Sequence, residues 1–112
     1  MKPVLYLLLR NDLPRYSVGA LVAQGIHASL QVLPRTQTAE TDQYFGPHLA
    51  VVVLSVAETE LGEAARVLEE HKVPYHPWTE HPENEVTCLC LSPVDKEVSE
   101  VPRLLRHLKL YK

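Results

Sequence analysis

The stretch PVLYLLLRNDLPRYSVGALVAQGIHAS, residues 3–29, decides the fold because a buried strand passes through a short turn into a helix. Residues 3–9 are a continuous apolar run of strand length, typical of a strand covered on both faces. Asn11, Asp12 and Pro14 then supply turn chemistry, and Ser17 is a suitable N-cap for the helix. This order indicates an α/β protein.

The helix that begins near Ser17 carries no formal charge through residue 29, although 22% of the chain is charged. On a helical wheel one face is mostly apolar, and we expect it to pack on a sheet: Val18, Leu21, Val22, Gly25, Ile26, Ser29 and Leu33. The opposite face is polar but neutral: Ala20, Gln24, His27 and Gln31. We predict that this neutral face lines a cleft.

Three further strands are expected, at residues 48–56, 73–80 and 85–93. The second of them contains Pro74 and Pro77, so we expect it to be irregular or at an edge of the sheet. The other two are apolar enough to be buried. Together with residues 3–9, they predict a mixed four-stranded β-sheet.

Two further helices complete the pattern. Residues 57–72 have apolar residues at helical spacing and acidic residues in the first turn, as the helix dipole favours. A last helix is expected from near Ser99 to the C-terminus, because Pro102 is tolerated only in a first turn. Residues 34–47 lack a core stripe and are expected to form a surface loop with room for one helical turn. We predict an α/β, three-layer α/β/α domain that spans residues 1–112 as a single unit.

The composition limits the possible partners. The net charge is −3, which argues against a protein that holds long duplex nucleic acid, and we expect no DNA partner. No apolar run approaches the roughly 20 residues needed to span a bilayer, so we expect a soluble, cytoplasmic protein without a membrane partner. Cys88 and Cys90 alternate on a strand, which favours reduced thiols in the core. Basic residues near both ends of the chain could form one patch for a short stretch of phosphate backbone.

Three motifs resemble the type II peptidyl-tRNA hydrolases in order, type and approximate spacing. They are RNDL at residues 10–13, VAQGIHA at 22–28 and HLKLY at 107–111. The shorter peptidyl-tRNA hydrolase domain-containing proteins are a closer match, since they share GALVAQ and the pattern W-x-E-x-PEN, here residues 78–84. The resemblance implies the same fold, a homodimer, and hydrolysis of the ester between a peptide and the 3′-terminal ribose of tRNA. No cofactor or resident metal is expected.

The chain departs from the parent family at two places. Ala20 stands where that family has a lysine, and Arg10 or Arg15 are the candidates to replace the missing charge. The second departure is in a loop that carries an aspartate and a threonine in the family. An ungapped alignment puts Tyr75 on the aspartate and Thr79 on the threonine, whereas a shortened loop puts Glu80 on the aspartate. We favour the shortened loop because it keeps a carboxylate.

The resemblance and the residue chemistry together nominate a site. Glu80 is the candidate general base or water-orienting carboxylate, Thr87 a hydrogen-bond donor, and Gln24 a neutral polar anchor on the facing helix. Asp12 is expected to organise the loop before the helix. The candidates for substrate contact are His27, Trp78, Arg10, Arg15, Arg106 and Lys109. Of these, Trp78 would stack on a terminal base, with a core role as its alternative, and the basic residues would contact phosphates.

Two other functions compete with the hydrolase. A metal enzyme is suggested by side chains that lie close in the sequence, although their spacing fits no zinc signature: His76, His81, Glu83, Cys88 and Cys90. A non-catalytic module that binds tRNA ends or a protein is favoured by Ala20 in place of the lysine. Retention of Gln24, Thr87 and a nearby carboxylate favours the hydrolase.

Overall fold

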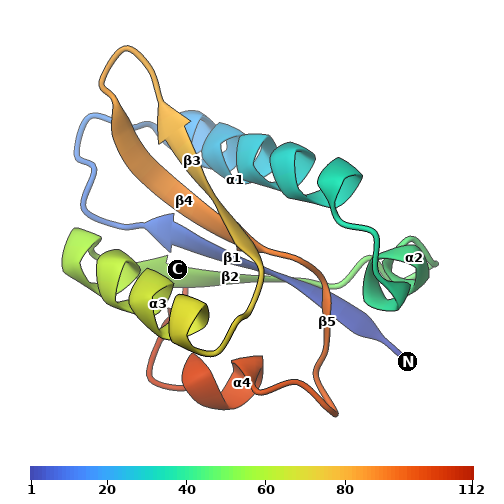
Figure 1. Cartoon of the computed structure of the whole chain (residues 1–112). Coiled ribbons are helices and arrows are strands. Elements are labelled where there is room, and N and C mark those ends of the chain that lie inside the picture. The colour runs from blue at the N-terminus through green and yellow to red at the C-terminus, as the bar shows by residue number, and fades with distance from the viewer.

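A mixed β-sheet forms the centre of the computed structural model, which describes residues 1–112 (Figure 1). Its path is β3-β4-β1-β2-β6, and β5 pairs with β1 beside that path. The four long strands lie where the sequence predicts them: β1 (Pro3–Arg10), β2 (Val51–Val56), β3 (Tyr75–Glu80) and β4 (Glu85–Leu91). β1 runs parallel to β2 and antiparallel to β4, and β3 is antiparallel to β4.

The expected number of four strands is wrong, because the sheet has six. The two additional strands, β5 (Val94–Asp95) and β6 (Lys109–Leu110), have two residues each. β5 pairs with the start of β1, and β6 pairs antiparallel with Leu54 and Ser55 of β2. Strands of this length leave no alternating pattern in the sequence.

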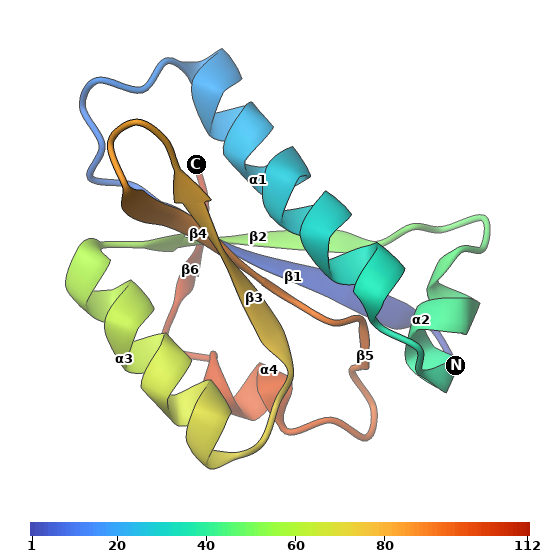
Figure 2. The same ribbon diagram turned by 45° about the horizontal axis from the view of Figure 1, so that its top comes forward.

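Helices cover both faces of the sheet (Figure 2). α1 (Val18–Val32), η1 (Leu33–Arg35) and α2 (Ala39–Tyr44) lie on one side, and α3 (Glu58–Glu70) and α4 (Val101–Leu104) on the other. Every residue of β1 is buried, and its side chains alternate between two apolar cores. No helix combines the length and the hydropathy that a bilayer-spanning segment needs.

The C-terminal segment differs from the predicted long helix. α4 has four residues and includes Pro102 in its first turn, as expected. The chain then turns and enters β6, because Lys109 and Leu110 pair with the exposed edge of β2. The hydroxyl of Tyr111 also donates to the Arg10 carbonyl oxygen at 3.0 Å, which holds the end of the chain against β1.

α1 packs on the sheet with a different face from the one predicted. Gln24 is 1% exposed and Ala28 is fully buried, whereas Val22 and Ile26 are 56% and 53% exposed. A buried amide is tolerated when its hydrogen bonds are made, and Gln24 finds partners on β3 and β4. Gly25 allows the close approach, since a Cβ there would lie 3.4 Å from a methyl group of Leu7.

Candidate active site

Gln24, Glu80 and Thr87 form one hydrogen-bonded chain between α1 and the β3–β4 hairpin. The Thr87 hydroxyl donates to Gln24 Oε1 at 2.7 Å, and Gln24 Nε2 donates to Glu80 Oε2 at 3.0 Å. Gln24 Nε2 also donates to the Ala20 carbonyl oxygen at 3.2 Å, one turn earlier in the helix. The structure therefore brings together the three side chains that the sequence analysis assigns to catalysis.

The Glu80 carboxylate is held in a fixed direction by two donors. Gln24 binds one oxygen, and the indole Nε1 of Trp78 donates to the other at 3.3 Å. Glu80 is half-buried, in contrast to the fully buried Thr87. Each carboxylate oxygen accepts more than one hydrogen bond, so Glu80 retains capacity to bind a water molecule.

Trp78 contacts the Glu80 carboxylate directly, and His27 contacts Trp78. Trp78 is half-buried on β3 and packs against the core on the α1 side of the sheet. The His27 ring lies against the indole, with ring centroids 4.6 Å apart and planes tilted by 45°. His27 Nδ1 is buried without a hydrogen-bond partner. The contact with Trp78 gives His27 a role in placing the indole, and Trp78 combines a core position with a hydrogen bond to Glu80.

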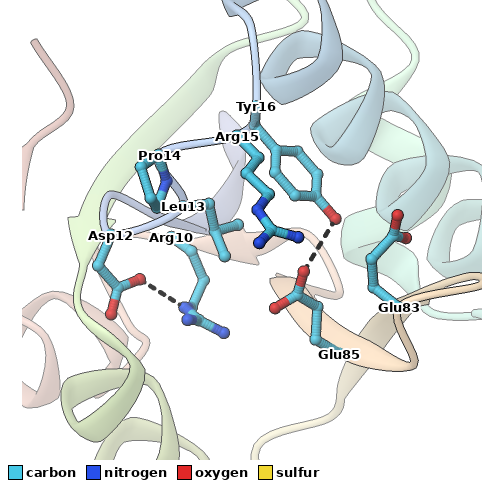
Figure 3. A pocket seen from close by; sticks show the side chains of 8 residues that line it. All are labelled: Arg10, Asp12, Leu13, Pro14, Arg15, Tyr16, Glu83 and Glu85. Carbon is cyan, nitrogen blue, oxygen red and sulfur yellow. Dashed lines mark hydrogen bonds and ion pairs between the residues drawn. The ribbon is translucent and has the colours of Figure 1, made fainter.

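A cavity of about 450 Å³ opens between the β1–α1 loop and the end of the β3–β4 hairpin (Figure 3). It is lined by Arg10, Asp12, Leu13, Pro14, Arg15, Tyr16, Glu83 and Glu85. Glu85 is the cross-strand partner of Glu80, and side chains at directly opposite positions share one face of a sheet. The cavity therefore adjoins the candidate carboxylate.

Tyr16 and Glu85 join the two walls of this cavity, and the sequence analysis missed both. The Tyr16 hydroxyl donates to Glu85 Oε2 at 3.2 Å. Burial, followed by the negative charges of Glu85, Glu83 and Glu80, raises the pKa of Tyr16 to about 12. The phenol is thus a protonated donor at neutral pH. The signal in the sequence was the hairpin register, which places Glu85 opposite Glu80 once the turn between them is recognised.

Arg10 has a different role from the predicted phosphate contact. Its side chain is 7% exposed, and its guanidinium donates to Asp12 Oδ1 at 2.7 Å and to the Val86 carbonyl oxygen at 3.0 Å. Its third contact is Glu58, at 3.5 Å. Through these acceptors, Arg10 links the β1–α1 loop to β4, and its guanidinium does not face solvent. Arg15 is exposed and lines the cavity, so it is the better placed of the two to replace the family lysine.

Arg106 and Lys109 lie far from Glu80 across the sheet. Lys109 belongs to β6 and Arg106 to the turn that leads into it, while Glu80 ends β3. β3 and β6 are the opposite edges of the main sheet, whereas Lys109 pairs with Ser55 of β2, whose other neighbour is Leu9 of β1. Both side chains are exposed.

The residues that suggested a metal enzyme lie on or beside the β3–β4 hairpin, where His76 and Cys90 are cross-strand partners. No group of three His, Cys, Asp or Glu side chains is arranged as a set of metal ligands. Cys88 and Cys90 are buried and unpaired, and burial raises the pKa of both thiols. These two cysteines belong to the core on the α1 side of the sheet.

The fold agrees with the comparison to known proteins. A family model described as peptidyl-tRNA hydrolase PTH2 matches residues 3–111, so the chain belongs to the peptidyl-tRNA hydrolase PTH2 family. Two similar relatives, from Homo sapiens and Mus musculus, are each named "Putative peptidyl-tRNA hydrolase PTRHD1". They are 38% and 37% identical to this chain, and each alignment covers 97% of the chain and 82% of the relative.

A solved structure supports the fold independently. The protein of unknown function Atu0240 from Agrobacterium tumefaciens strain C58 superposes with a TM-score of 0.70, over 100% of this chain and 99% of that one. The two sequences are 12% identical, so the likeness concerns the fold alone.

Proposed function

We propose that this protein hydrolyses the ester that links a peptide to the 3′-terminal ribose of tRNA. The observation that carries the proposal is the hydrogen-bonded chain of Thr87, Gln24 and Glu80, in which a half-buried carboxylate is aimed by two donors beside an open cavity. Membership of the peptidyl-tRNA hydrolase PTH2 family supports this substrate class.

In the proposed reaction Glu80 acts as the general base. It accepts a proton from water while the water oxygen attacks the ester carbonyl carbon, and the same proton then passes to the departing ribose oxygen. Gln24 and Thr87 keep the carboxylate in place and do not exchange protons. The negative charge that develops on the carbonyl oxygen needs donors, and the cavity offers the Arg15 guanidinium. The Tyr16 hydroxyl would become a second donor only by exchanging its hydrogen bond to Glu85 for one to the substrate.

Contacts to the tRNA follow from the positions of the remaining candidates. Arg15 is the proposed phosphate contact near the ester. Trp78 is the proposed stacking surface for a terminal base, and its contact with the His27 ring would hold the indole in place. Arg106 and Lys109 would meet phosphates farther along the RNA, because they lie at the other edge of the sheet. Neither DNA nor a membrane is part of the proposal.

A second candidate function is a tRNA-end or protein-binding module without catalysis. The observation that favours it is Ala20, which leaves no side-chain charge in the first turns of α1. In such a module the cavity would hold the terminal nucleotide and Glu80 would serve only as a hydrogen-bond acceptor. The two functions differ in whether the ester is consumed.

Release of an N-blocked amino acid from charged tRNA distinguishes them. We expect turnover by the wild type above the spontaneous rate, and a decrease of about 10²–10⁴-fold for Glu80→Gln, the range of general-base catalysis. Glu97→Gln is the matched control, because Glu97 is exposed and lies outside the cavity. Wild-type turnover no faster than the spontaneous rate, with retained tRNA binding, would select the module. Full activity of Glu80→Gln would overturn the role of Glu80 only.

A further inference from the structure

The cavity beside the candidate carboxylate carries opposite charges on its two walls. Arg15 comes from the β1–α1 loop, and Glu83 and Glu85 come from the β3–β4 hairpin (Figure 3). Arg10 also lines the cavity, but its charge is paired with that of Asp12. Arg15, Glu83 and Glu85 belong to none of the ion pairs of the structure. The cavity therefore has a positive loop side and a negative hairpin side.

Negative charge exceeds positive charge in and beside this cavity. After burial, the charges of Glu85, Glu83 and Glu80 are what raises the pKa of Tyr16 to about 12. Glu83 is exposed, and Glu85 is half-buried and accepts the Tyr16 hydroxyl with only one of its two oxygens. Both carboxylates therefore have free capacity to accept hydrogen bonds from a ligand. A ligand group that is a cation is favoured on the hairpin side.

The hairpin register places this negative side close to the reacting ester. Glu85 and Glu80 are cross-strand partners, and side chains at directly opposite positions have Cβ atoms about 4.5–5.5 Å apart. In an aminoacyl ester a single carbon atom separates the carbonyl carbon from the α-amino nitrogen. An ester whose carbonyl carbon is attacked by a water on Glu80 therefore brings its α-amino group within reach of Glu85. The charge of a lysine side chain lies several bonds further from the ester.

We propose that the cavity selects an acyl group with a free α-ammonium, so that the preferred substrate is an aminoacyl ester of tRNA over an N-blocked one. This inference rests on the proposed ester hydrolysis and adds a preference for the acyl group. Glu85 and Glu83 bind the ammonium on the hairpin side, and Arg15 binds the phosphate of the terminal nucleotide on the loop side. N-blocked esters remain substrates, because Glu80 and its water are the same, but they lose the contact with the two carboxylates.

Binding of stable analogues tests this selectivity without any turnover. The probes are 3′-alanylamido-3′-deoxyadenosine 5′-phosphate, in which an amide replaces the ester, and its N-acetyl derivative. The measurement is made at about pH 6.5, where an α-amino group with an ordinary pKa of about 7.7–8.0 is protonated. Isothermal titration calorimetry should then give an affinity about 10-fold higher for the free amine, as one charge-assisted hydrogen bond provides.

Substitution of the two hairpin carboxylates tests whether they cause the preference. The double variant Glu83→Gln/Glu85→Gln keeps the side-chain size and an acceptor oxygen at both positions but removes the charges. Its preference for the free amine should fall to about twofold or less. Glu83→Gln alone, at an exposed position that tolerates substitution, should remove part of the preference. Glu97→Gln is the matched control, because Glu97 is exposed and lies outside this cavity, and it should keep the full preference.

A third probe separates the α-ammonium from a basic side chain as the source of positive charge. The N-acetyl-lysyl analogue carries its only ammonium at the end of the side chain. We expect it to bind no more tightly than the N-acetyl-alanyl analogue, because its charge lies too far from the ester to meet Glu85. Binding as tight as that of the free alanyl probe would refute the assignment to the α-amino group.

Deacylation of charged tRNA connects the binding preference to the proposed reaction. Release of alanine and of N-acetylalanine, each divided by its own spontaneous rate, should favour the free amine by a similar factor in kcat/KM. The selectivity is wrong if the two alanyl probes bind equally or not at all, or if the double variant keeps the wild-type preference. A protein that shows the binding preference but releases neither acyl group would support the selectivity and refute the hydrolase alone.

Discussion

α1 and α3 cover opposite faces of the same sheet, but they differ in their charged residues and in the side chains that they bury. α3 has six charged residues among 13, and its buried side is wholly apolar, with Leu61, Ala64 and Leu68. α1 has no charged residue among 15, and its most buried side chains include Gln24. α3 is an ordinary cover, apolar toward the sheet and charged toward water. In α1 both sides depart from that pattern, and the buried side, with Gln24, belongs to the candidate active site.

The two helices also differ in what stabilises them. Burial of α3 depends on apolar area, so its contribution scales with the side chains removed from water. Burial of Gln24 is favourable only while Thr87 and Glu80 satisfy the amide, because an unsatisfied buried polar group costs free energy. Substitutions in the two helices should therefore have different signatures.

The largest expected effect comes from the buried side of α3. Leu68→Ala should lower the free energy of unfolding by about 2–5 kcal/mol, because Leu68 is fully buried and its removal leaves a cavity. The same substitution at Leu30, which is 63% exposed on α1, should change it by less than about 0.5 kcal/mol in the monomer. Urea unfolding at micromolar protein concentration or below measures both. Equal losses would show that Leu30 is packed against the rest of the chain, contrary to its exposed position.

A smaller effect is expected at Gln24. Gln24→Ala removes the acceptor of the buried Thr87 hydroxyl and one donor of Glu80, which should cost about 1–3 kcal/mol of the free energy of unfolding. Gln31→Ala is the matched control on the same helix and should be nearly neutral, because Gln31 is only half-buried and makes no comparable contact. If Gln24→Ala leaves the free energy of unfolding unchanged, the hydrogen bonds of Gln24 do not stabilise the packing of α1.

The sequence carries enough information for the four long strands and for both main helices. Their apolar periodicity extends over several residues, and the structure places β1 to β4, α1 and α3 where the pattern predicts them. β6 was missed because its two residues have no period of their own and depend on the free edge of β2. The predicted C-terminal helix failed for the same reason, since pairing with Ser55 outweighed local helical preference.

The orientation of α1 could not be read from its own sequence. A helical wheel assigns Gln24 to the outer face because glutamine is polar, but its partners Glu80 and Thr87 lie 56 and 63 residues further along the chain. The resemblance to the family still nominated all three residues, because a family pattern shows which side chains occur together even when they are far apart in the sequence. The buried position of Arg10 could not be read from the sequence either, because two of its acceptors, Val86 and Glu58, lie 76 and 48 residues further along the chain.

The smallest expected effect concerns Asp12, which connects the two helices compared above. It follows β1 in the loop before α1, and its Oδ2 accepts the backbone N–H of Glu58 in the first turn of α3 at 3.0 Å. The N-cap of α3 is Ala57, which has no side-chain acceptor, so Asp12 supplies one from another part of the chain. Asp12→Asn keeps an oxygen that can accept this N–H but removes the charge paired with Arg10, which should lower the free energy of unfolding by at most about 1 kcal/mol at pH 7. Asp42→Asn, at an exposed acid in α2, should have a smaller effect.

The difference in the free energy of unfolding between the wild type and Asp12→Asn should depend on pH if the charge of Asp12 causes it. The hydrogen bond from Arg10 and the Glu58 N–H hold the pKa of Asp12 below its ordinary value. A carboxyl group with a lowered pKa contributes stability above the pKa of the unfolded chain, and the contribution is lost as the pH falls through the folded value. The gap between wild type and Asp12→Asn should therefore be full at pH 7 and shrink once the pH falls below about 4. Urea titrations across this range measure it, and a gap that stays constant down to low pH would show that Asp12 acts on α3 by shape alone, without its charge.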